Sequence, residues 1–409
     1  MKITCVGGGP AALYLCILVK LDNPAHEVTV LERNQKGTTY GWGVTYWSDT
    51  LALLEAHDPI SARGIRRHSM RWRDGMAQVG GRTTTQAGDA GYAIGRHQLL
   101  HILAQRAQEL GVRTEFGHDI HEGTPLPDAE LIVAADGMHS RLRSKDAQHF
   151  GTHITSGKNR FLWLGTTKVF TTFSFAFVHT AHGWLWCYAY GFSPTQSTCV
   201  IECSPSTWRG LGLDTMGQED CLRFLEQHFA TLLDGHPLIS REDRIRDGQN
   251  WQAFRTVTNR TWSHNNVVLL GDAAHSTHFS IGAGTALALQ DAVVLAEQLR
   301  TVPEQGLATA LAQYEKQRKH ALLPVQSAAR HSAQWYESLP RYLRLPPDQM
   351  FALLGQRHSP LLPYVPPGLY YRLDRAASRV SVLRSFKRWL GPRIGRTVQR
   401  SSNARTSTS

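Results

Sequence analysis

The stretch that decides the fold begins the chain and reads Lys2-Ile3-Thr4-Cys5-Val6-Gly7-Gly8-Gly9-Pro10-Ala11-Ala12-Leu13. Its first five residues form a short apolar run, which predicts a buried strand, and residues 11–21 have the spacing of a helix. Residues 27–32 predict a second strand. Strand, glycine turn, helix and strand in this order are typical of a right-handed parallel crossover, the building unit of α/β proteins.

The glycines of this turn match the dinucleotide-binding pattern G-x-G-x-x-(G/A), with Ala12 in the third place. Gly7 permits the tight turn, Gly9 lets the backbone approach a pyrophosphate, and the small Ala12 lets the helix pack near the strand. Glu32 ends the second strand, where a carboxylate can bind the ribose hydroxyls of an adenosine. We therefore expect a Rossmann-like sheet that binds FAD or NAD, although three glycines alone can simply form a turn.

Two further motifs come after the buried strands that are expected at residues 131–135 and 267–270. Asp136-Gly137 ends the first, and its simplest interpretation is a turn with a basic flank. Gly271-Asp272 ends the second, at the carboxyl end of a strand, where α/β proteins bind ligands. Residues 282–285 then open a helix, whose N-terminus can stabilise negative charge on a reduced flavin or can simply be a glycine-rich helix entry.

The middle of the chain differs in character. Residues 173–178, 184–192 and 197–203 are rich in aromatic and β-branched residues and predict antiparallel strands. Rings recur at alternating positions, which favours one packed face of a sheet and also allows a wall for an aromatic ligand. These positions are Phe173, Phe175, Phe177, Trp184, Trp186, Tyr188, Tyr190 and Phe192.

Parallel-type elements on both sides of this segment predict two interleaved domains and C-terminal helices. The FAD-binding domain is expected at residues 1–75, 90–160 and 255–330, and the antiparallel substrate domain at 76–89 and 161–254. A helical region is expected at 331–395 and a disordered basic tail at 396–409.

Some local features can also be predicted between the motifs. A glycine-punctuated loop is expected at residues 37–47, with Gly41 and Gly43 as hinges that could let a flavin move. Helices are expected at residues 285–300 and 307–319, and Pro324 should interrupt the chain beyond the second helix.

The three motifs, in this order, resemble the single-component (group A) FAD-dependent aromatic hydroxylases over residues 2–330. More specific stretches resemble the branch with the tryptophan hydroxylase of violacein biosynthesis and the hydroxylases of salicylyl-CoA and anthraniloyl-CoA. One departure from many members is that no proline follows Gly271-Asp272-Ala273-Ala274-His275. The branch-specific stretches are Gly41-Trp42-Gly43-Val44, Gly157-Lys158-Asn159-Arg160, Trp163-Leu164-Gly165-Thr166, Val200-Ile201-Glu202-Cys203 and His278-Phe279-Ser280-Ile281-Gly282.

The resemblance implies bound FAD, NADH or NADPH as a transient electron donor, and hydroxylation of an electron-rich aromatic ring through a flavin C4a-hydroperoxide. Cofactor contacts are expected from the three motifs, from the Trp42-Gly43 pair and from the first residue of an R-x-x-L stretch. These residues are Gly7, Gly9, Pro10, Ala11, Ala12, Glu32, Arg33, Trp42, Gly43, Arg96, Asp136, Asp272, Gly282, Ala283, Gly284 and Thr285.

The substrate side of the site is less well marked by the sequence. Phe177, Trp186 and Phe279 are expected to line a substrate pocket. His278 and Tyr188 are candidates for acid–base catalysis, although a structural histidine and a packed tyrosine are the simpler interpretations. No metal site is expected, because no His/Cys cluster has zinc spacing.

The charge and the cysteine content of the chain help to predict its binding partners and its cellular compartment. The net charge is +11, and residues 378–409 contribute eight positive charges and no acid, which predicts a solvated tail or a docking site for an anionic partner. Six cysteines without a CxxC pair suit the cytoplasm, and no apolar run approaches the ~18 residues of a membrane span. We expect a small aromatic substrate and dioxygen as partners, and neither nucleic acid nor a membrane; a homo-oligomer is left open.

Three classes of function are weighed. The favoured one is a hydroxylase of secondary metabolism that acts on an indole, phenol or hydroxypyridine, or on an aryl-CoA thioester. The second is an FAD-dependent reductase or oxidase on the same scaffold, without oxygen insertion. The third is a binder of nucleic acid or membrane surfaces that acts through the basic tail.

Overall fold

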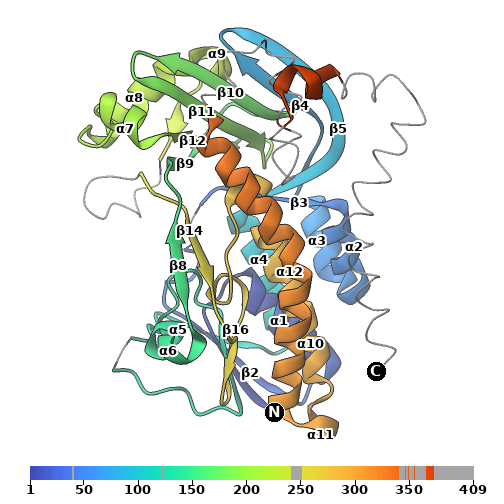
Figure 1. The fold of residues 1–409 in the computed structure, drawn as a ribbon. Coiled ribbons are helices and arrows are strands. Elements are labelled where there is room, and N and C mark those ends of the chain that lie inside the picture. Colours follow the sequence, from blue (N-terminus) through green and yellow to red (C-terminus); the bar gives the residue numbers. More distant parts are fainter. Residues whose placement is uncertain are drawn as a thin grey trace. The chain divides into compact units, whose positions relative to one another are not determined.

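The structure is a computed structural model that describes residues 1–38, 41–121, 123–240, 251–339 and 365–372, and the single residues 346, 349 and 354. The chain divides into two compact units, Met1–Arg318 and Lys319–Ser409. All the motifs of the sequence lie in the first unit, which contains two large sheets (Figure 1). The predicted tail at 396–409 and most of the region 331–395 lie outside the described residues.

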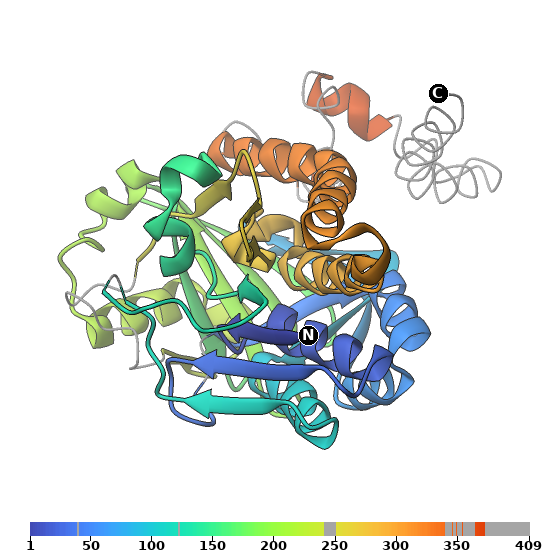
Figure 2. The same cartoon turned by 90° about the horizontal axis from the view of Figure 1, so that it is seen from below.

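A six-stranded sheet contains the predicted crossover, in the order β15-β16-β7-β1-β2-β6. Neighbouring strands are parallel except at the edge pair β15 and β16. In Figure 2, β2 (blue) and β6 (teal) run side by side in one direction. The strands expected at 2–6, 27–32, 131–135 and 267–270 are confirmed. The strands are β1 (Lys2–Val6), β2 (Glu27–Glu32), β6 (Arg113–Phe116), β7 (Leu131–Ala134), β15 (Ser263–His264) and β16 (Val267–Leu269).

Three helices pack together beside this sheet. Helix α1 (Pro10–Asp22) contacts α4 (Arg96–Glu109) and α10 (Gly284–Leu299). Its first ten residues are all buried, because neighbours cover it on more than one side. The other helices and turns of the unit are α2 (Ser48–His57), α3 (Pro59–Arg67), α5 (Arg141–Lys145), α6 (Ala147–Phe150), α7 (Pro205–Gly210), α8 (Gln218–His228), α9 (Ala230–Leu233), η2 (Gly271–Ala273), η3 (Phe279–Ile281) and α11 (Val302–Gln305).

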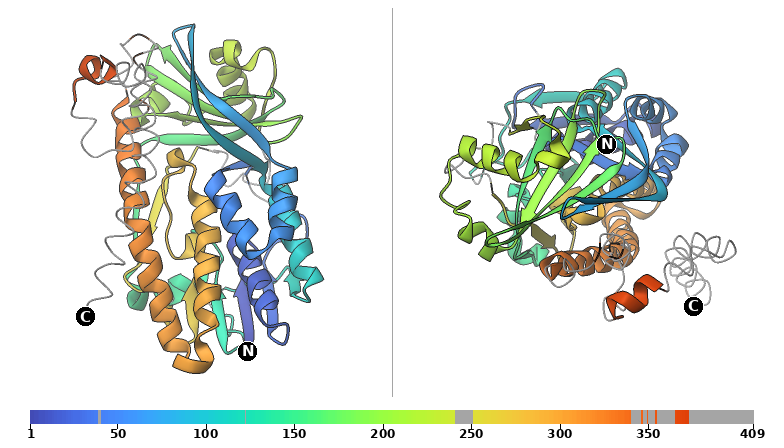
Figure 3. Two further views of the ribbon diagram at one scale, coloured as in Figure 1. Left: turned by 90° about the vertical axis from the view of Figure 1, so that its right-hand side faces the viewer. Right: turned by 90° about the horizontal axis from the view of Figure 1, so that it is seen from above.

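An eight-stranded sheet contains the aromatic middle of the chain, in the order β13-β9-β12-β11-β10-β4-β5-β3. Only the β4–β10 pair is parallel. Figure 3 (left) shows this sheet above the helices of the first sheet. The strands are β3 (Gly43–Trp47), β4 (Met70–Val79), β5 (Arg82–Gly95), β9 (Arg160–Thr166), β10 (Phe173–Thr180), β11 (Gly183–Gly191), β12 (Ser197–Cys203) and β13 (Leu238–Ile239); β8 (His153–Ser156) pairs separately with β14 (Arg255–Thr258).

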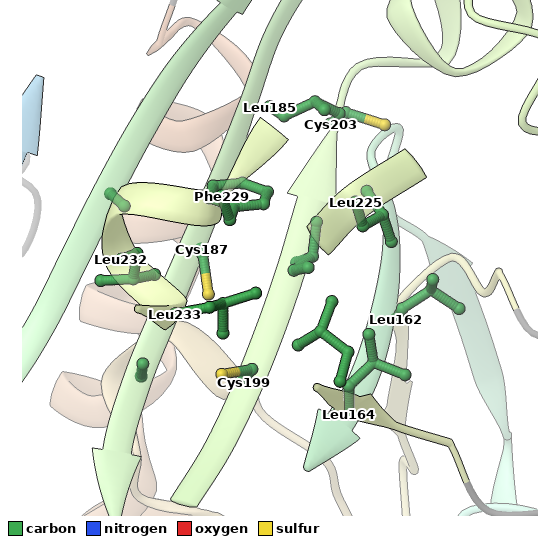
Figure 4. Close-up of a cluster of buried hydrophobic side chains, with 14 of the residues drawn as sticks. Leu162, Leu164, Leu185, Cys187, Cys199, Cys203, Leu225, Phe229, Leu232 and Leu233 are labelled. Atoms are coloured by element: carbon green, nitrogen blue, oxygen red, sulfur yellow. The ribbon is translucent and has the colours of Figure 1, made fainter. Parts of the chain in front are cut away.

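The two faces of this sheet carry different side chains. Alternate residues on one face are small or aliphatic, such as Cys187, Cys199 and Ile201, and they pack with Leu225 and Phe229 in a buried cluster (Figure 4). The opposite face carries the rings, because antiparallel register places Phe175 opposite Tyr188 and Phe177 opposite Trp186. The predicted alternation of the rings is therefore confirmed.

Two local predictions are wrong. The expected loop at 37–47 contains strand β3, because Gly43 to Trp47 pair with Gly91 to Gly95 of β5; Thr39 and Tyr40 lie outside the described residues. Pro324 does not interrupt the chain, because α12 (Leu307–Glu337) continues through it. A proline inside a helix removes one N–H donor and strains the preceding turn, but tertiary context can outweigh this cost.

The sheets are interleaved along the chain, as two discontinuous domains require. The first sheet takes its strands from residues 2–32, 113–134 and 263–269, and the second from 43–95 and 160–239. All of β3, β4 and β5 belong to the second sheet, a longer segment than the predicted 76–89. The domain boundaries themselves stay a prediction. None of the helices in the described parts of the chain combines the length and the apolar character needed to cross a membrane.

Candidate active site

The glycine turn joins β1 to α1 and leaves the start of the helix open. Gly7 has a φ of +102°, and a Cβ there would lie 2.4 Å from the Ala135 carbonyl oxygen, so only glycine fits. Gly9 has an ordinary extended backbone, and a Cβ there would have no atom of the described residues within 4 Å apart from its chain neighbours. None of the described side chains caps the N-terminus of α1, which starts at Pro10 and continues through Ala11 and Ala12. The N–H groups of its first turn are therefore available to a ligand.

Glu32 lies beside this turn, at the end of β2. Its Oε2 accepts a hydrogen bond from Gly8 N (2.7 Å), and its Oε1 accepts one from Asn34 N (2.8 Å). These bonds hold the carboxylate in place beside the open helix end. Arg33 comes next as an exposed side chain.

Asp136 follows β7 by two residues and lies against the glycine turn, since its Cα is 2.8 Å from the Cβ that an alanine at position 7 would have. Its Oδ2 accepts a hydrogen bond from Arg141 N (2.7 Å), whereas its buried Oδ1 has no hydrogen-bond partner among the described residues. Arg143 then connects this motif to the next, because its Nη1 donates to Ala273 O (3.0 Å) and its Nη2 to Met138 O (2.6 Å). An unpartnered buried carboxylate oxygen is costly, so Asp136 fits a site that a polar ligand completes.

Asp272 comes after β16, in η2. Gly271 lies against the first turn of α1, with only 3.3 Å between its hypothetical Cβ and the Ala11 Cβ. The Asp272 side chain is exposed, yet desolvation by the surrounding protein raises its carboxyl pKa, and the charges of His275 and Arg96 partly oppose this. The two observations agree if the carboxylate is open to solvent on one side and enclosed by protein on the others.

A second open helix end lies close to the eight-stranded sheet. Gly282 has a φ of +64°, and its hypothetical Cβ would lie 2.6 Å from Thr45 Oγ1 of β3. Ala283 precedes α10 without a side-chain cap, and a Cβ on Gly284 would meet no atom of the described residues within 4 Å outside its own helix turn. Thr285 is half-buried in the same first turn. This helix end can therefore accept a negatively polarised group, as the end of α1 can.

The Gly41-Trp42-Gly43 segment is held tightly against the eight-stranded sheet. A Cβ on Gly41 would lie 2.5 Å from the Trp163 ring, and the Trp42 ring would lie 2.5 Å from a Cβ on Gly165. Gly43 N donates to Thr198 Oγ1 (2.9 Å), and Trp42 O accepts from Arg96 N (2.8 Å). Close packing thus explains the glycines by itself, and their role as hinges stays a prediction.

A buried network of hydrogen bonds connects the segment after η2 to helix α10. Asp291 of α10 accepts hydrogen bonds from His275 Nε2 (2.8 Å) and Arg318 Nε (2.6 Å). Burial would raise the pKa of the Asp291 carboxyl, but the charges of His275 and Arg318 outweigh burial and lower it. Trp262 stacks on His275 at 5.2 Å. The residues after Asp272 are thereby fixed to α10.

A hydrogen-bonded chain runs across the ring-bearing face of the eight-stranded sheet. Trp186 Nε1 donates to Tyr188 Oη (3.0 Å), and the Tyr188 hydroxyl donates to Glu202 Oε2 (2.8 Å). Asn159 Nδ2 donates to Glu202 Oε1 (2.7 Å). Tyr188 therefore serves first as a link to a buried carboxylate. The Tyr188 ring also contacts Phe279 of η3, with 6.1 Å between centroids.

His278 and Phe279 bring η3 against the same face. The Phe279 ring lies 4.8 Å from Phe161 of β9, and the His278 ring lies 4.8 Å from Phe254. His278 Nδ1 accepts a hydrogen bond from Ser280 N (3.3 Å). Burial lowers the pKa of His278 to about 4, so the imidazole is neutral at pH 7. It can accept a proton only weakly, as expected for a structural histidine.

Comparison with known proteins identifies the family. A family model described as an FAD binding domain matches residues 127–327. Salicyloyl-CoA 5-hydroxylase of Streptomyces sp is 36% identical, over 84% of this chain and 67% of its own. A 5-monooxygenase of Streptosporangium sibiricum, named for 3-hydroxy-4-methyl-anthranilyl on an aryl-carrier protein, is 34% identical over 83% of this chain and 90% of its own. The chain belongs to the FAD-dependent aromatic hydroxylases.

The fold of this hydroxylase agrees with that of solved relatives. The tetrameric form of 2-methyl-3-hydroxypyridine-5-carboxylic acid oxygenase has a TM-score of 0.66 at 18% identity, covering 84% of this chain and 92% of that one. The predicted fold class and the suspected family are confirmed. The hydroxylase is an FAD-dependent monooxygenase, and NAD(P)H is the electron donor typical of its family.

The residues of this hydroxylase fit FAD. The open end of α1 would hold the pyrophosphate, Glu32 the adenosine ribose and Asp272 the ribitol, while the open end of α10 would face the polar edge of the flavin. The unpartnered Asp136 Oδ1 and the free space at Gly9 and Gly284 agree with a bound polar group. When bound, FAD takes electrons from NAD(P)H and passes them to dioxygen.

The structure brings most of the predicted cofactor residues together. A Cβ on Gly7 would clash with Asp136, a Cβ on Gly271 would lie 3.3 Å from the Ala11 Cβ, and Thr45 Oγ1 donates a hydrogen bond to Gly282 O, so the three motifs meet around the two helix ends. Their individual roles stay predictions. Asn159 and Glu202 lie in branch-specific stretches, but sequence reasoning assigned no role to either residue. An acid inside the otherwise apolar run 199–203 was the signal that could have singled out Glu202.

Proposed function

We propose that this hydroxylase acts on a benzoyl group that is linked to a carrier as a thioester and bears a hydroxyl or amino group at position 2. We propose that it introduces the new hydroxyl group at position 5. One observation carries the proposal: the two reported relatives above 30% identity are named for salicyloyl-CoA and for an anthranilyl group on a carrier protein, and both are named for position 5.

The chemistry of such a ring supports this choice. Position 5 is para to position 2, and the lone pair of a hydroxyl or amino group at position 2 increases electron density at the para carbon. An electrophilic oxygen is therefore directed to that carbon without deprotonation by the protein. The neutral His278 and the hydrogen-bonded Tyr188 suit this requirement, because neither is prepared to act as a strong base.

The proposed contribution of the protein is position and exclusion of water. Phe177, Trp186 and Phe279 are the residues that we propose to enclose the ring, together with Tyr188. A dry environment matters because water promotes loss of the activated oxygen as hydrogen peroxide. The hydrogen bonds from Trp186 to Tyr188 and from Tyr188 to Glu202 keep the Tyr188 and Trp186 side chains in fixed orientations, which supports a site of defined shape.

The test is a substrate comparison with the purified, FAD-loaded protein. NADH and NADPH oxidation would be followed with salicyloyl-CoA and 2-aminobenzoyl-CoA, with their free acids, and with indoles, phenols and hydroxypyridines. Hydrogen peroxide would be quantified in parallel, and products from ¹⁸O₂ analysed by mass spectrometry. We expect fast oxidation, little peroxide and one labelled oxygen at position 5 only with a thioester.

Other results would overturn parts of the proposal separately. Efficient, labelled hydroxylation of a free indole, phenol or hydroxypyridine would exclude the thioester preference and leave the hydroxylase assignment intact. Electron transfer without label in any product would favour a reductase or an oxidase. A protein that cannot be loaded with FAD would contradict the cofactor assignment itself.

A further inference from the structure

A cluster of metal-binding side chains lies apart from the residues assigned to FAD and substrate. Asp146, His149 and His264 each offer one ligand atom, and these atoms all lie within 4.8 Å of one another. Asp146 and His149 are three residues apart around α6, so they are neighbours on one side of that helical turn. His264 comes from the edge strand β15, 118 residues from Asp146 along the chain.

The three side chains already contact one another. His264 Nδ1 and Asp146 Oδ2 form a short contact, and the His149 ring stacks on the His264 ring with 3.6 Å between centroids and 14° between planes. The side chains of His264 and Asp146 are 36% and 39% exposed, and His149 is exposed, so an ion from solvent can reach them. Parallel rings cannot both direct a nitrogen at one ion, so binding requires the exposed His149 ring to turn.

The backbone that carries these ligands is fixed by a second set of hydrogen bonds. Arg260 N donates to Phe150 O (2.7 Å), and Thr261 Oγ1 donates to His149 O (3.1 Å). These bonds tie the segment just before β15 to helix α6. A metal site needs its ligands held in place by such supporting contacts, and here only side-chain rotation is left to complete the geometry.

We propose that Asp146, His149 and His264 bind one divalent transition-metal ion of the Zn²⁺ type. Two imidazole nitrogens and one carboxylate oxygen are a ligand set that suits Zn²⁺, with water in the fourth position. The ion connects α6 to the β15–β16 hairpin. Strand β16 leads directly to Asp272, so the ion stabilises the region where the second and third sequence motifs meet.

The experiment uses the full chain with any purification tag removed, stripped of metal by a chelator and loaded with FAD. Zn²⁺ binding would be measured by calorimetry and by elemental analysis after gel filtration. Co²⁺ would serve as a spectroscopic probe, because its visible bands report coordination by nitrogen and oxygen. The variants are His264→Gln, His149→Gln and Asp146→Asn. His153→Gln, an exposed histidine on nearby β8, is the matched control.

We expect one equivalent of Zn²⁺ in the wild type and in the control. Each ligand variant should bind that equivalent at least about tenfold more weakly, since even supporting residues of metal sites contribute 10–100-fold to affinity. Zn²⁺ should also raise the unfolding temperature of the wild type and the control more than that of the variants. His149→Gln alters an exposed side chain, so a folded variant is available even if His264→Gln fails to fold.

Two results would overturn the proposal. Zn²⁺ retention that is equal in the wild type and in His149→Gln would place any binding elsewhere among the histidines. Absence of a bound equivalent in the wild type would leave the cluster as a stacked histidine pair beside a carboxylate. Both readouts are independent of hydroxylation, so they do not depend on the proposed function.

Discussion

At the residue scale, two buried tyrosines show that a hydroxyl group can contribute very differently to the stability of the fold. The Tyr188 hydroxyl lies between Trp186 and Glu202 and bonds to both. The Tyr14 hydroxyl is buried in α1 and has no hydrogen-bond partner in the part of the chain that the structure describes, and burial strongly raises its pKa. A buried polar group stabilises a fold only when it is paired, so the two residues should respond in opposite ways to removal of the oxygen.

We therefore predict that Tyr188→Phe destabilises the protein by roughly 1–3 kcal/mol, because a buried carboxylate loses a donor and a buried indole N–H loses an acceptor. Tyr14→Phe is the matched control and should be neutral or stabilising, since it removes an unpaired hydroxyl. Denaturant unfolding of both variants measures the difference. Equal stability of the two variants would show that the Tyr188–Glu202 bond contributes nothing.

His278 gives a prediction about pH. Burial lowers its pKa from 6.5 to about 4, so between these values the unfolded chain binds more protons than the folded one. The stability contributed by the neutral imidazole is complete above about pH 6.5 and is lost as the pH falls toward 4. His278→Asn keeps an acceptor for Ser280 N and removes the titration. The unfolding temperature of this variant should fall less between pH 6.5 and pH 4.5 than that of the wild type.

A control separates this effect from the general acid sensitivity of the fold. His121→Asn alters an exposed histidine and should leave the pH dependence unchanged. Parallel curves for the wild type and His278→Asn would contradict the lowered pKa of the half-buried His278.

At the element scale, the two open helix ends are features that the fold alone does not require. Gly7 must be glycine because of its positive φ and its contact with Ala135. Gly9 has neither constraint, since its φ is −75° and the space beyond its Cα is free. A side chain at position 9 would therefore affect a ligand at the end of α1 more than it would affect the folded chain.

We predict that Gly9→Asp folds normally but binds FAD at least about tenfold more weakly, equivalent to ~1.4 kcal/mol. Aspartate is a favoured N-cap residue, so α1 itself should not be weakened. Its charge, however, would repel a pyrophosphate at the same helix end. Gly9→Asn has the same size without the charge and should weaken binding less. Flavin fluorescence titration and the unfolding temperature of the FAD-free variants measure the two effects.

The outcome distinguishes a structural from a ligand-binding role. A Gly9→Asp protein that retains wild-type FAD affinity would place the pyrophosphate elsewhere. A protein that no longer folds without FAD would show that the glycine serves the fold.

At the scale of the whole molecule, the chemistry is concentrated in the unit Met1–Arg318, while most of the excess charge lies in the last residues of the chain. The three motifs and the ring-bearing sheet face all belong to that unit. The eight basic residues between 378 and 409 lie outside the described residues. A solvated tail and a docking site for an anionic partner predict different results when this segment is removed.

We predict that deletion of residues 378–409 leaves FAD content, kcat and KM for the aromatic substrate unchanged. Steady-state NAD(P)H oxidation with quantified product measures this. A rise in KM after deletion, combined with a salt dependence that only the full chain shows, would instead indicate that the tail attracts an anionic substrate or partner.

The order of motifs along the chain determined the family, the cofactor and the main layers of the fold. Each motif depends on local chemistry: φ at Gly7, apolar runs at 2–6 and 131–134, and alternating rings at 173–192. Such features are encoded within a few residues, so they can be recognised without a structure. Predictions for 37–47 and Pro324 failed because pairing with β5 and the context of α12 outweighed local propensity.

Only the tertiary structure decided which distant residues act together. Glu202 meets Tyr188 and Asn159 because β11, β12 and β9 pair in one register, and a shift by one residue would turn those side chains to the opposite face. His264 meets Asp146 because β15 is a sheet edge beside α6. The sequence by itself determined a flavin-binding hydroxylase scaffold. The chain of hydrogen bonds at Glu202 and the histidine cluster depend on long-range packing, which no local pattern records.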